Sequence, residues 1–147
     1  TLLKNNTFII WKGGQPADFE LKLEFRIAEA GNSGINYRSE KIDTIPYALR
    51  GYQADIDGKI RYTGQNYEEK KRFLLPLYGT RVLAQNLQVV RLIIKGNKLQ
   101  HYINDILMSE VIDDDNVNRA SSGYLGVQVH VGPPMKVEYR NIRLKNL

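Results

Sequence analysis

The sequence predicts an all-β domain built as a two-sheet antiparallel β-sandwich. Apolar and polar residues alternate with a period of two along most of the chain, which is typical of half-buried strands. Gly, Pro and Asn residues separate these short segments at turn positions, and helical periodicity is nearly absent. Many short strands joined by tight turns favour a sandwich over alternating strand–helix units.

The clearest strand is expected at residues 19–27, where every second residue is apolar. Further strands are expected at 34–38, 51–57, 89–95, 99–103, 106–111, 125–131 and 135–144. Gly96-Asn97 and Asn104-Asp105 are two-residue hairpin turn signals. The phase of the last strand shifts near Arg140-Asn141, which predicts a bulge. The best helical candidate is a short turn at 66–72.

Length and composition fit one domain spanning residues 1–147, with no repeat, linker or low-complexity tract. No run approaches the roughly 18–20 apolar residues of a membrane helix, so no membrane insertion is expected. The absence of cysteine excludes disulfides, thiolate nucleophiles and Cys-ligated zinc. The net charge is +5, but basic residues are interleaved with acidic ones, which favours a solvated surface over nucleic-acid binding.

Strand parity predicts a polar face that spans three strands. If the apolar residues of each strand point inward, the residues that point outward are Asn36, Arg38, Gln53, Asp55, Asp57, Gln128 and His130. Planar amides, a guanidinium, carboxylates and an imidazole can pair with vicinal hydroxyls, and nine Tyr residues with Trp11 offer aromatic platforms. Any sandwich has outward polar residues, however, so an ordinary solvated face stays open as the alternative.

Four segments resemble one family when taken in order. They are GNSGINYR at 31–38, GYQADI at 51–56, KGNKLQHYIN at 95–104 and GVQVHVGPPMKVEYRNI at 126–142. Together they resemble the 3-keto-disaccharide hydrolase domain, formerly a domain of unknown function, over residues 3–147. The resemblance implies a concanavalin A-like jelly-roll fold, a carbohydrate substrate and a periplasmic or cell-surface location. Compared with the family, some N-terminal residues are expected to be lacking in this chain.

The resemblance implies a set of polar site residues. They are Asn32, Arg38, Gln53, Asp55, His101, Gln128, His130 and Arg140, with Tyr67, Glu69 and Arg72 from a segment resembling an acidic loop that leans over the site. The family often has Glu at the position of Gln53 and Gln at that of Asp55, so the identity of the base stays open. No cofactor is required; a divalent cation is not indicated, although one that assists the reaction is not excluded.

The implied substrate is a 3-keto-glycoside, whose ketone acidifies the C2 proton. The expected roles are a base at His130 or Asp55, enolate and hydroxyl anchors at Arg38 and Gln128, and an acid at Glu69.

Structural alternatives stand beside several of these roles. His101 shares parity with apolar neighbours, which favours a buried, hydrogen-bonded histidine. Arg38 could pair with Asp55 across strands, and Asn32 could only shape a turn. Acidic residues 113–115 are expected to form a solvated turn rather than a cation site. A non-catalytic carbohydrate-binding domain and a laminin-G-like interaction module stay open as other functions.

Overall fold

The computed structural model of the protein describes residues 2–59, 61–74 and 87–147. The first sheet, called the front sheet below, contains the strands β1 (Thr7–Ile10), β3 (Asn32–Lys41), β4 (Leu49–Asp57), β5 (Asn66–Glu69), β6 (Phe73–Leu74) and β10 (Tyr124–Val129). The second sheet, called the back sheet below, contains β2 (Phe19–Ile27), β7 (Gln88–Lys95), β8 (Lys98–Ile103), β9 (Ile106–Ile112) and β11 (Val137–Asn146).

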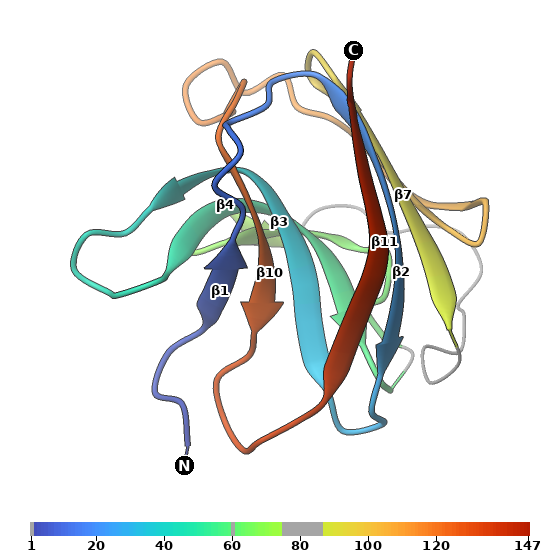
Figure 1. The fold of residues 1–147 in the computed structure, drawn as a ribbon. Helices are drawn as coiled ribbons and strands as arrows, with labels where there is room; N and C mark the ends of the chain where they lie inside the picture. The colour runs from blue at the N-terminus through green and yellow to red at the C-terminus, as the bar shows by residue number, and fades with distance from the viewer. Residues whose placement is uncertain (1, 60, 75–86) are drawn as a thin grey trace.

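The two sheets are antiparallel and pack face to face (Figure 1). The front sheet has the order β1-β10-β3-β4-β5-β6, and the back sheet has the order β11-β2-β7-β8-β9. The described residues contain no helix. The predicted all-β, two-sheet antiparallel sandwich is therefore confirmed.

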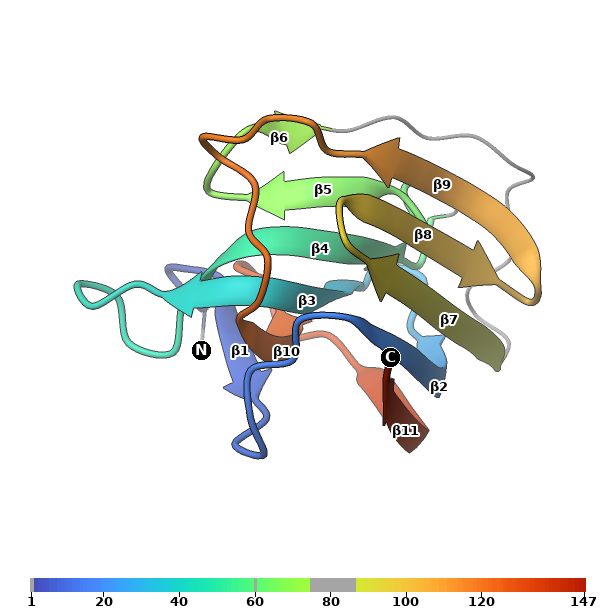
Figure 2. The same ribbon diagram turned by 90° about the horizontal axis from the view of Figure 1, so that it is seen from above.

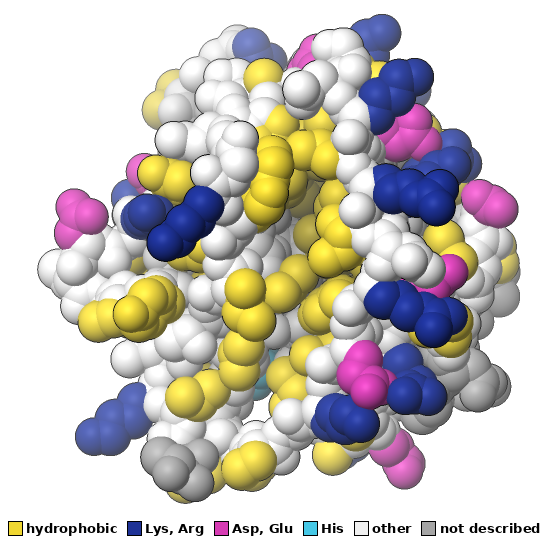
Figure 3. Space-filling model, in the orientation of Figure 1, with side chains coloured by type: hydrophobic (Ala, Val, Ile, Leu, Met, Phe, Trp, Pro, Cys, Tyr) yellow, Lys and Arg dark blue, Asp and Glu magenta, His cyan; other side chains and the backbone are white. Residues whose placement is uncertain are grey.

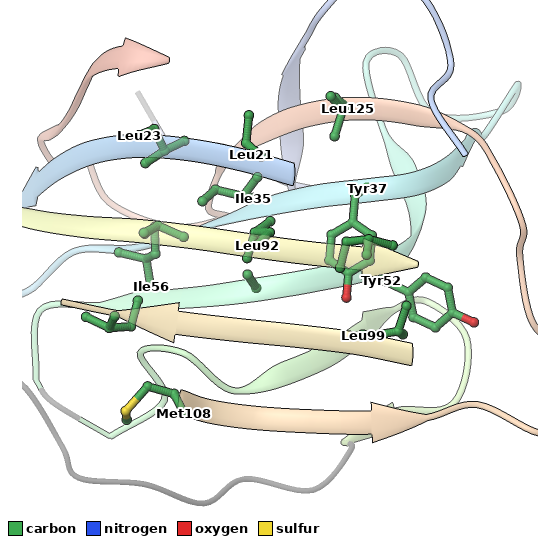
Figure 4. Packing of buried hydrophobic residues seen from close by; sticks show 14 of the residues in the cluster. Leu21, Leu23, Ile35, Tyr37, Tyr52, Ile56, Leu92, Leu99, Met108 and Leu125 are labelled. Atoms are coloured by element: carbon green, nitrogen blue, oxygen red, sulfur yellow. The ribbon is translucent and has the colours of Figure 1, made fainter. Parts of the chain in front are cut away.

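The core lies between the sheets and is built by the alternation seen in the sequence. In β2, residues 19, 21, 23, 25 and 27 are all buried, while the polar residues between them are partly or fully exposed. From the front sheet, Ile35, Tyr37, Tyr52 and Ile56 meet Leu92 and other apolar residues of the back sheet (Figure 4). Burial of these side chains contributes about 1.5–3 kcal/mol each, so the sandwich core is the main source of stability.

The predicted turns and bulge are confirmed. β7 and β8 are joined at Gly96-Asn97, and β8 and β9 at Asn104-Asp105, whose φ angles of 50° and 64° fit a type I′ turn. The pairing of β11 with β2 shifts register between Arg140 and Arg143, with Asn141 at a φ of 52°.

The expected helical turn at 66–72 is wrong. Residues 66–69 form β5, which pairs with β4 in the register Gln53↔Tyr67. Lys70 then has a φ of 54°, which a right-handed helix does not allow. The strand pairing with β4 therefore overrides the weak helical pattern.

The sandwich is closed along one side and open along the other. β9 of the back sheet lies beside β5 of the front sheet and closes one side (Figure 2). On the other side, β1 and β11 leave an apolar hollow of about 530 Å³ between them. Figure 3 shows hydrophobic side chains gathered along this hollow, which reaches core residues Leu21, Leu23 and Ile35.

Candidate functional site

The outward face of the front sheet carries a row of polar side chains across three neighbouring strands. Asn36 of β3 lies opposite Gln53 of β4 on one side and Gly126 of β10 on the other. Gln128 lies two residues beyond Gly126 on β10 and therefore shares this face. Asn36, Gln53 and Gln128 are all buried, with exposed fractions of 0%, 2% and 2%. The strands that the sequence could not place side by side are therefore neighbours.

Gln53 connects these strands through its amide group. Its Nε2 donates to Asp55 Oδ1 at 2.7 Å, and its Oε1 accepts a hydrogen bond from Gln128 Nε2 at 3.2 Å. The side chain reaches across β3 because position 34 is a glycine. A Cβ at Gly34 would lie only 2.6 Å from the Gln53 side chain. Gly34 therefore lets Gln53 lie flat against the sheet.

Asp55 is a titratable group on this face whose pKa lies near neutrality. It is half-buried, and burial raises its pKa from 3.8 to about 7, opposed by the hydrogen bond from Gln53 and reinforced by the charges of Asp57 and Glu69. Its second oxygen accepts a hydrogen bond from Gln65 Nε2 at 3.4 Å. A carboxylate with a pKa near neutrality can serve as a general base.

The outward face is strongly concave. Asn6, which directly precedes β1, donates from Nδ2 to Glu69 Oε1 of β5 at 3.2 Å. In the sheet, β10, β3 and β4 lie between β1 and β5, so a flat sheet would separate those strands by about 19 Å. Two side chains of this length cannot bridge that gap, so the sheet must curl. Asn6 and Glu69 thus connect the two sides of a concave polar face.

Tyr67 and Glu69 also belong to the concave face. Tyr67 lies opposite Gln53, and Glu69 opposite Gly51, in the pairing of β5 with β4. Tyr67 is half-buried, and its ring lies 6.0 Å from the ring of Phe73. The structure therefore brings together five of the predicted site residues: Gln53, Asp55, Tyr67, Glu69 and Gln128.

His130 and Asn32 lie at one end of the concave face. Both line a pocket of about 270 Å³, together with Tyr62 and Arg61. His130 Nδ1 lies 2.7 Å from the carbonyl oxygen of Val131, and because a carbonyl only accepts, Nδ1 carries the proton. Nε2 is the ring nitrogen of His130 that this contact does not use.

The expectation that Arg38 points outward is wrong. Arg38 has a φ of 44° at a register irregularity between β3 and β4, and this breaks the alternation after Tyr37. Its side chain is buried at 3% exposure and forms an ion pair with Asp18 at 2.9 Å. It also donates to the carbonyl oxygens of Ala17, Gly96 and Ala120. Arg38 therefore ties β3 to the segments that flank the back sheet, and it does not pair with Asp55.

His101 lies inside the sandwich, apart from the concave face. Its Nδ1 lies 3.3 Å from Gly64 O, and its Nε2 lies 2.7 Å from the hydroxyl of Tyr37. Burial lowers its pKa to about 4, against the effect of hydrogen bonds to the backbone. His101 is therefore a buried, hydrogen-bonded histidine, as the parity of its strand favoured, and it does not lie on the face with the other expected site residues.

Arg72 also lies on the inner side of the front sheet. The segment expected to be an acidic loop consists of β5 and the turn at residues 70–72. It pairs with Glu68 at 2.5 Å and with Asp113 at 2.6 Å. Glu68 is fully buried, and Tyr52 donates its hydroxyl hydrogen to Asp113. Because β5 alternates, Glu68 points inward while Glu69 points outward. Asp113 is therefore a buried ion-pair partner, not part of a solvated turn.

Asn6 and Gln65 contact residues of the candidate site, and the sequence did not reveal either contact. Asn6 precedes its strand and lies far along the chain from Glu69, so no local pattern connects them. Gln65 lies in the loop before β5. Among the described residues, no group of three or more His, Asp or Glu side chains could hold a metal ion. No helix in the described part of the chain is long and apolar enough to cross a membrane.

Solved structures with the same architecture come from carbohydrate-related proteins. The carbohydrate binding module CBM66 from Bacillus subtilis has a TM-score of 0.76 at 18% identity, covering 98% of this chain and 84% of that one. A candidate glycosyl hydrolase from Parabacteroides distasonis has a TM-score of 0.72 at 15% identity, covering 95% and 76%. Another from the same organism has a TM-score of 0.71 at 18% identity, covering 98% and 85%. At these identities the likeness shows the fold alone.

The family assignment comes from the sequence as a whole. No curated protein matches the chain. The family of 3-keto-alpha-glucoside-1,2-lyase-like domains, in contrast, matches residues 2–145, which is nearly the whole chain. The resemblance carried by residues 31–38, 51–56, 95–104 and 126–142 is thereby confirmed. This protein is a carbohydrate-related domain and belongs to the family of 3-keto-alpha-glucoside-1,2-lyase-like domains.

Proposed function

We propose that the concave face binds a 3-keto-glycoside and that Asp55 removes the C2 proton as the first step of glycosidic bond cleavage. The observation that carries this proposal is the half-buried Asp55 carboxyl, with a pKa of about 7, beside the amide row of Gln53 and Gln128. Family membership supports the substrate class. A base with this pKa is about half ionised at neutral pH and is also basic enough to accept a carbon-bound proton.

The reaction proceeds by elimination and hydration. The base takes the proton from C2, the electron pair moves into the enolate with charge on O3, and the C1–O bond then breaks as a C1–C2 double bond forms. The leaving oxygen takes a proton and departs as an alcohol. Water then adds across the double bond, with hydroxide at C1 and a proton at C2, so the net change is hydrolysis.

The amides and the second carboxyl supply the remaining groups. The amide N–H groups of Gln53 and Gln128 can stabilise the enolate oxygen by donating hydrogen bonds. Glu69 is the proposed acid for the leaving oxygen. The anchoring role considered for Arg38 is not proposed, because its donors serve Ala17, Asp18, Gly96 and Ala120. His130, with Nε2 as its basic nitrogen, is the alternative base.

The test is turnover of a p-nitrophenyl 3-keto-α-glucoside by wild type and Asp55→Asn. We expect Asp55→Asn to lower kcat by about 10²–10⁴-fold, the usual contribution of a general base. Asp105→Asn is the matched control, since Asp105 lies exposed in the β8–β9 turn of the other sheet. Full activity in Asp55→Asn together with loss of activity in His130→Asn would transfer the role of base to His130. Activity unchanged in both variants would refute the mechanism.

A non-catalytic carbohydrate-binding domain is the second candidate. It is favoured by the reciprocal pairing of Gln53 with Gln128 and by the use of the Glu69 carboxylate to hold Asn6, since both leave fewer groups for chemistry. Calorimetry with the 3-keto-glucoside and with its parent α-glucoside separates the two. Binding of either sugar without release of p-nitrophenol would select this function.

A further inference from the structure

Asn36 has an amide group that is fully buried and has no hydrogen-bond partner. Its exposed fraction is 0%, and neither Nδ2 nor Oδ1 forms a hydrogen bond. Nearly all buried polar atoms in proteins are paired, because burial without a partner is unfavourable. The unpaired amide of Asn36 therefore needs an explanation. Asn36 lies on the concave face, two residues from Gly34, over which Gln53 reaches toward Gln128.

The amide of Asn36 lies on the concave face beneath neighbouring side chains. Its neighbour on β10 is Gly126, and Gly34 is the preceding outward residue on β3, so neither adds a side chain beside it. A Cβ added at Gly126 would instead lie 2.9 Å from Leu49 Cδ1, 3.2 Å from the backbone oxygen of Ile9 and 3.5 Å from Phe8 Cβ. The space above Gly34 is filled by Gln53. The Gln53 side chain thus covers Gly34, and the Leu49 side chain makes the nearest contact above Gly126.

The hydrogen bonds that join the Gln53 side chain above Gly34 to Gln128 are also weak. Gln53 and Gln128 exchange two hydrogen bonds, of 3.2 Å and 3.5 Å, which are long for N–H···O bonds. A ligand that offered hydroxyl groups to both amides could replace these bonds without leaving either amide unpaired. Parting the two side chains would then open the way to Asn36.

We infer that Asn36 is a sugar-contacting residue, whose amide binds two adjacent oxygens of the ligand after the Gln53–Gln128 pair parts. The inference rests on the proposed carbohydrate function of the concave face. A primary amide presents an acceptor and a donor side by side, and this matches a hydroxyl next to a second hydroxyl or a ketone. The orphaned amide is then paired only in the complex, which favours ligands that carry both oxygens.

The test is Asn36→Leu, which keeps the size of the side chain but removes its polar atoms. Because the free protein loses an unpaired buried amide, we expect the Tm to rise by about 2–4 °C. Because the ligand loses a partner, we expect the Kd for p-nitrophenyl 3-keto-α-glucoside to rise at least about tenfold. A residue with a purely structural role would not give opposite effects on stability and affinity.

Asn146→Leu is the matched control, since Asn146 is exposed in β11 of the back sheet and should bind the sugar as wild type does. If the branched Leu side chain prevents folding, Asn36→Ala replaces it with the same expected loss of affinity. Unchanged affinity in a folded Asn36 variant would overturn the inference and leave the proposed function intact. Failure of the wild type to bind or cleave the 3-keto-glucoside would overturn the proposed function itself.

Discussion

Two carboxyl groups on neighbouring strands of the front sheet show how the environment of a residue determines its role. Asp55 points to the concave face and accepts hydrogen bonds from the neutral amides of Gln53 and Gln65, and burial raises its pKa to about 7. Glu68 points between the sheets, is fully buried and meets the guanidinium of Arg72. One group can exchange a proton near neutral pH, while the other forms a buried ion pair with Arg72.

The raised pKa of Asp55 predicts a pH dependence of stability. Between pH 4 and 7 the folded protein keeps a proton on Asp55 that the unfolded chain has released, so the free energy of unfolding falls as pH rises through this window. Asp55→Asn cannot ionise and should lose this dependence. We expect the stability of Asp55→Asn relative to wild type to increase by on the order of 1–3 kcal/mol from pH 4 to pH 8.

Urea denaturation of both proteins at several pH values measures this difference. Asp105→Asn again serves as the control for removal of an exposed carboxylate. A stability difference that stays constant from pH 4 to pH 8 would mean that Asp55 has an ordinary pKa, and it would also weaken the assignment of Asp55 as the base.

The buried ion pair predicts a large effect of Arg72→Ala. Removal of Arg72 leaves the carboxylate of Glu68 buried at 0% exposure without its guanidinium partner. We expect a loss of about 3–5 kcal/mol in unfolding free energy by urea denaturation. The double variant Arg72→Ala/Glu68→Gln removes the charge and should recover part of this loss. A loss below about 1 kcal/mol in the single variant would show that the pair behaves like a surface ion pair.

At the scale of strands, local pattern predicted most of the fold. The alternation of β2, the two hairpin turns and the bulge of β11 follow from side-chain parity and from residues that accept positive φ angles. Parity failed in β3, where the positive φ of Arg38 turns its side chain to the inner side. No neighbouring Gly, Asn or Asp marks this irregularity, so the sequence carries no signal for it.

The turn between β8 and β9 predicts a stabilising substitution. Asp105 has a φ of 64°, and Asn-Gly is the preferred pair for a type I′ turn. Asp105→Gly should raise the free energy of unfolding by about 0.5–1 kcal/mol, because glycine adopts this conformation without strain. Asp105→Ala is the comparison and should be less stable than wild type, since alanine resists a positive φ. Equal Tm values for the Gly and Ala variants would contradict the turn geometry.

At the scale of the whole molecule, the concave face depends on curvature that no local pattern reports. Parity placed Gln53, Asp55 and Gln128 on one face correctly, and the sheet order makes their strands neighbours. The approach of Asn6 to Glu69 follows only from the curl of the complete sheet. Sequence reasoning therefore found the residues at the centre of the face and missed those that shape its rim.

The open side of the sandwich predicts that the native protein binds a hydrophobic dye. The hollow between β1 and β11 is lined by Ile9, Trp11 and Ile142, which are 69%, 45% and 59% exposed. Because the chain contains one Trp, energy transfer from Trp11 to bound anilinonaphthalene sulfonate would locate the dye in this hollow. Ile142→Lys should abolish the transfer, whereas Val117→Lys, at an exposed site outside the hollow, should not. Equal transfer in both variants would place the dye elsewhere.

The connection between Asn6 and Glu69 also bears on how the protein folds. Asn6 directly precedes β1, and β1 pairs with β10, which lies more than a hundred residues later in the chain. The pairing of β1 with β10 is therefore among the most non-local in the described part of the molecule. Non-local pairings carry a large loop-closure entropy and generally form late. The hairpins of β7, β8 and β9 can form first. The rim of the concave face forms only after β1 has paired with β10. A refolding chain should thus regain its core before its concave face is complete.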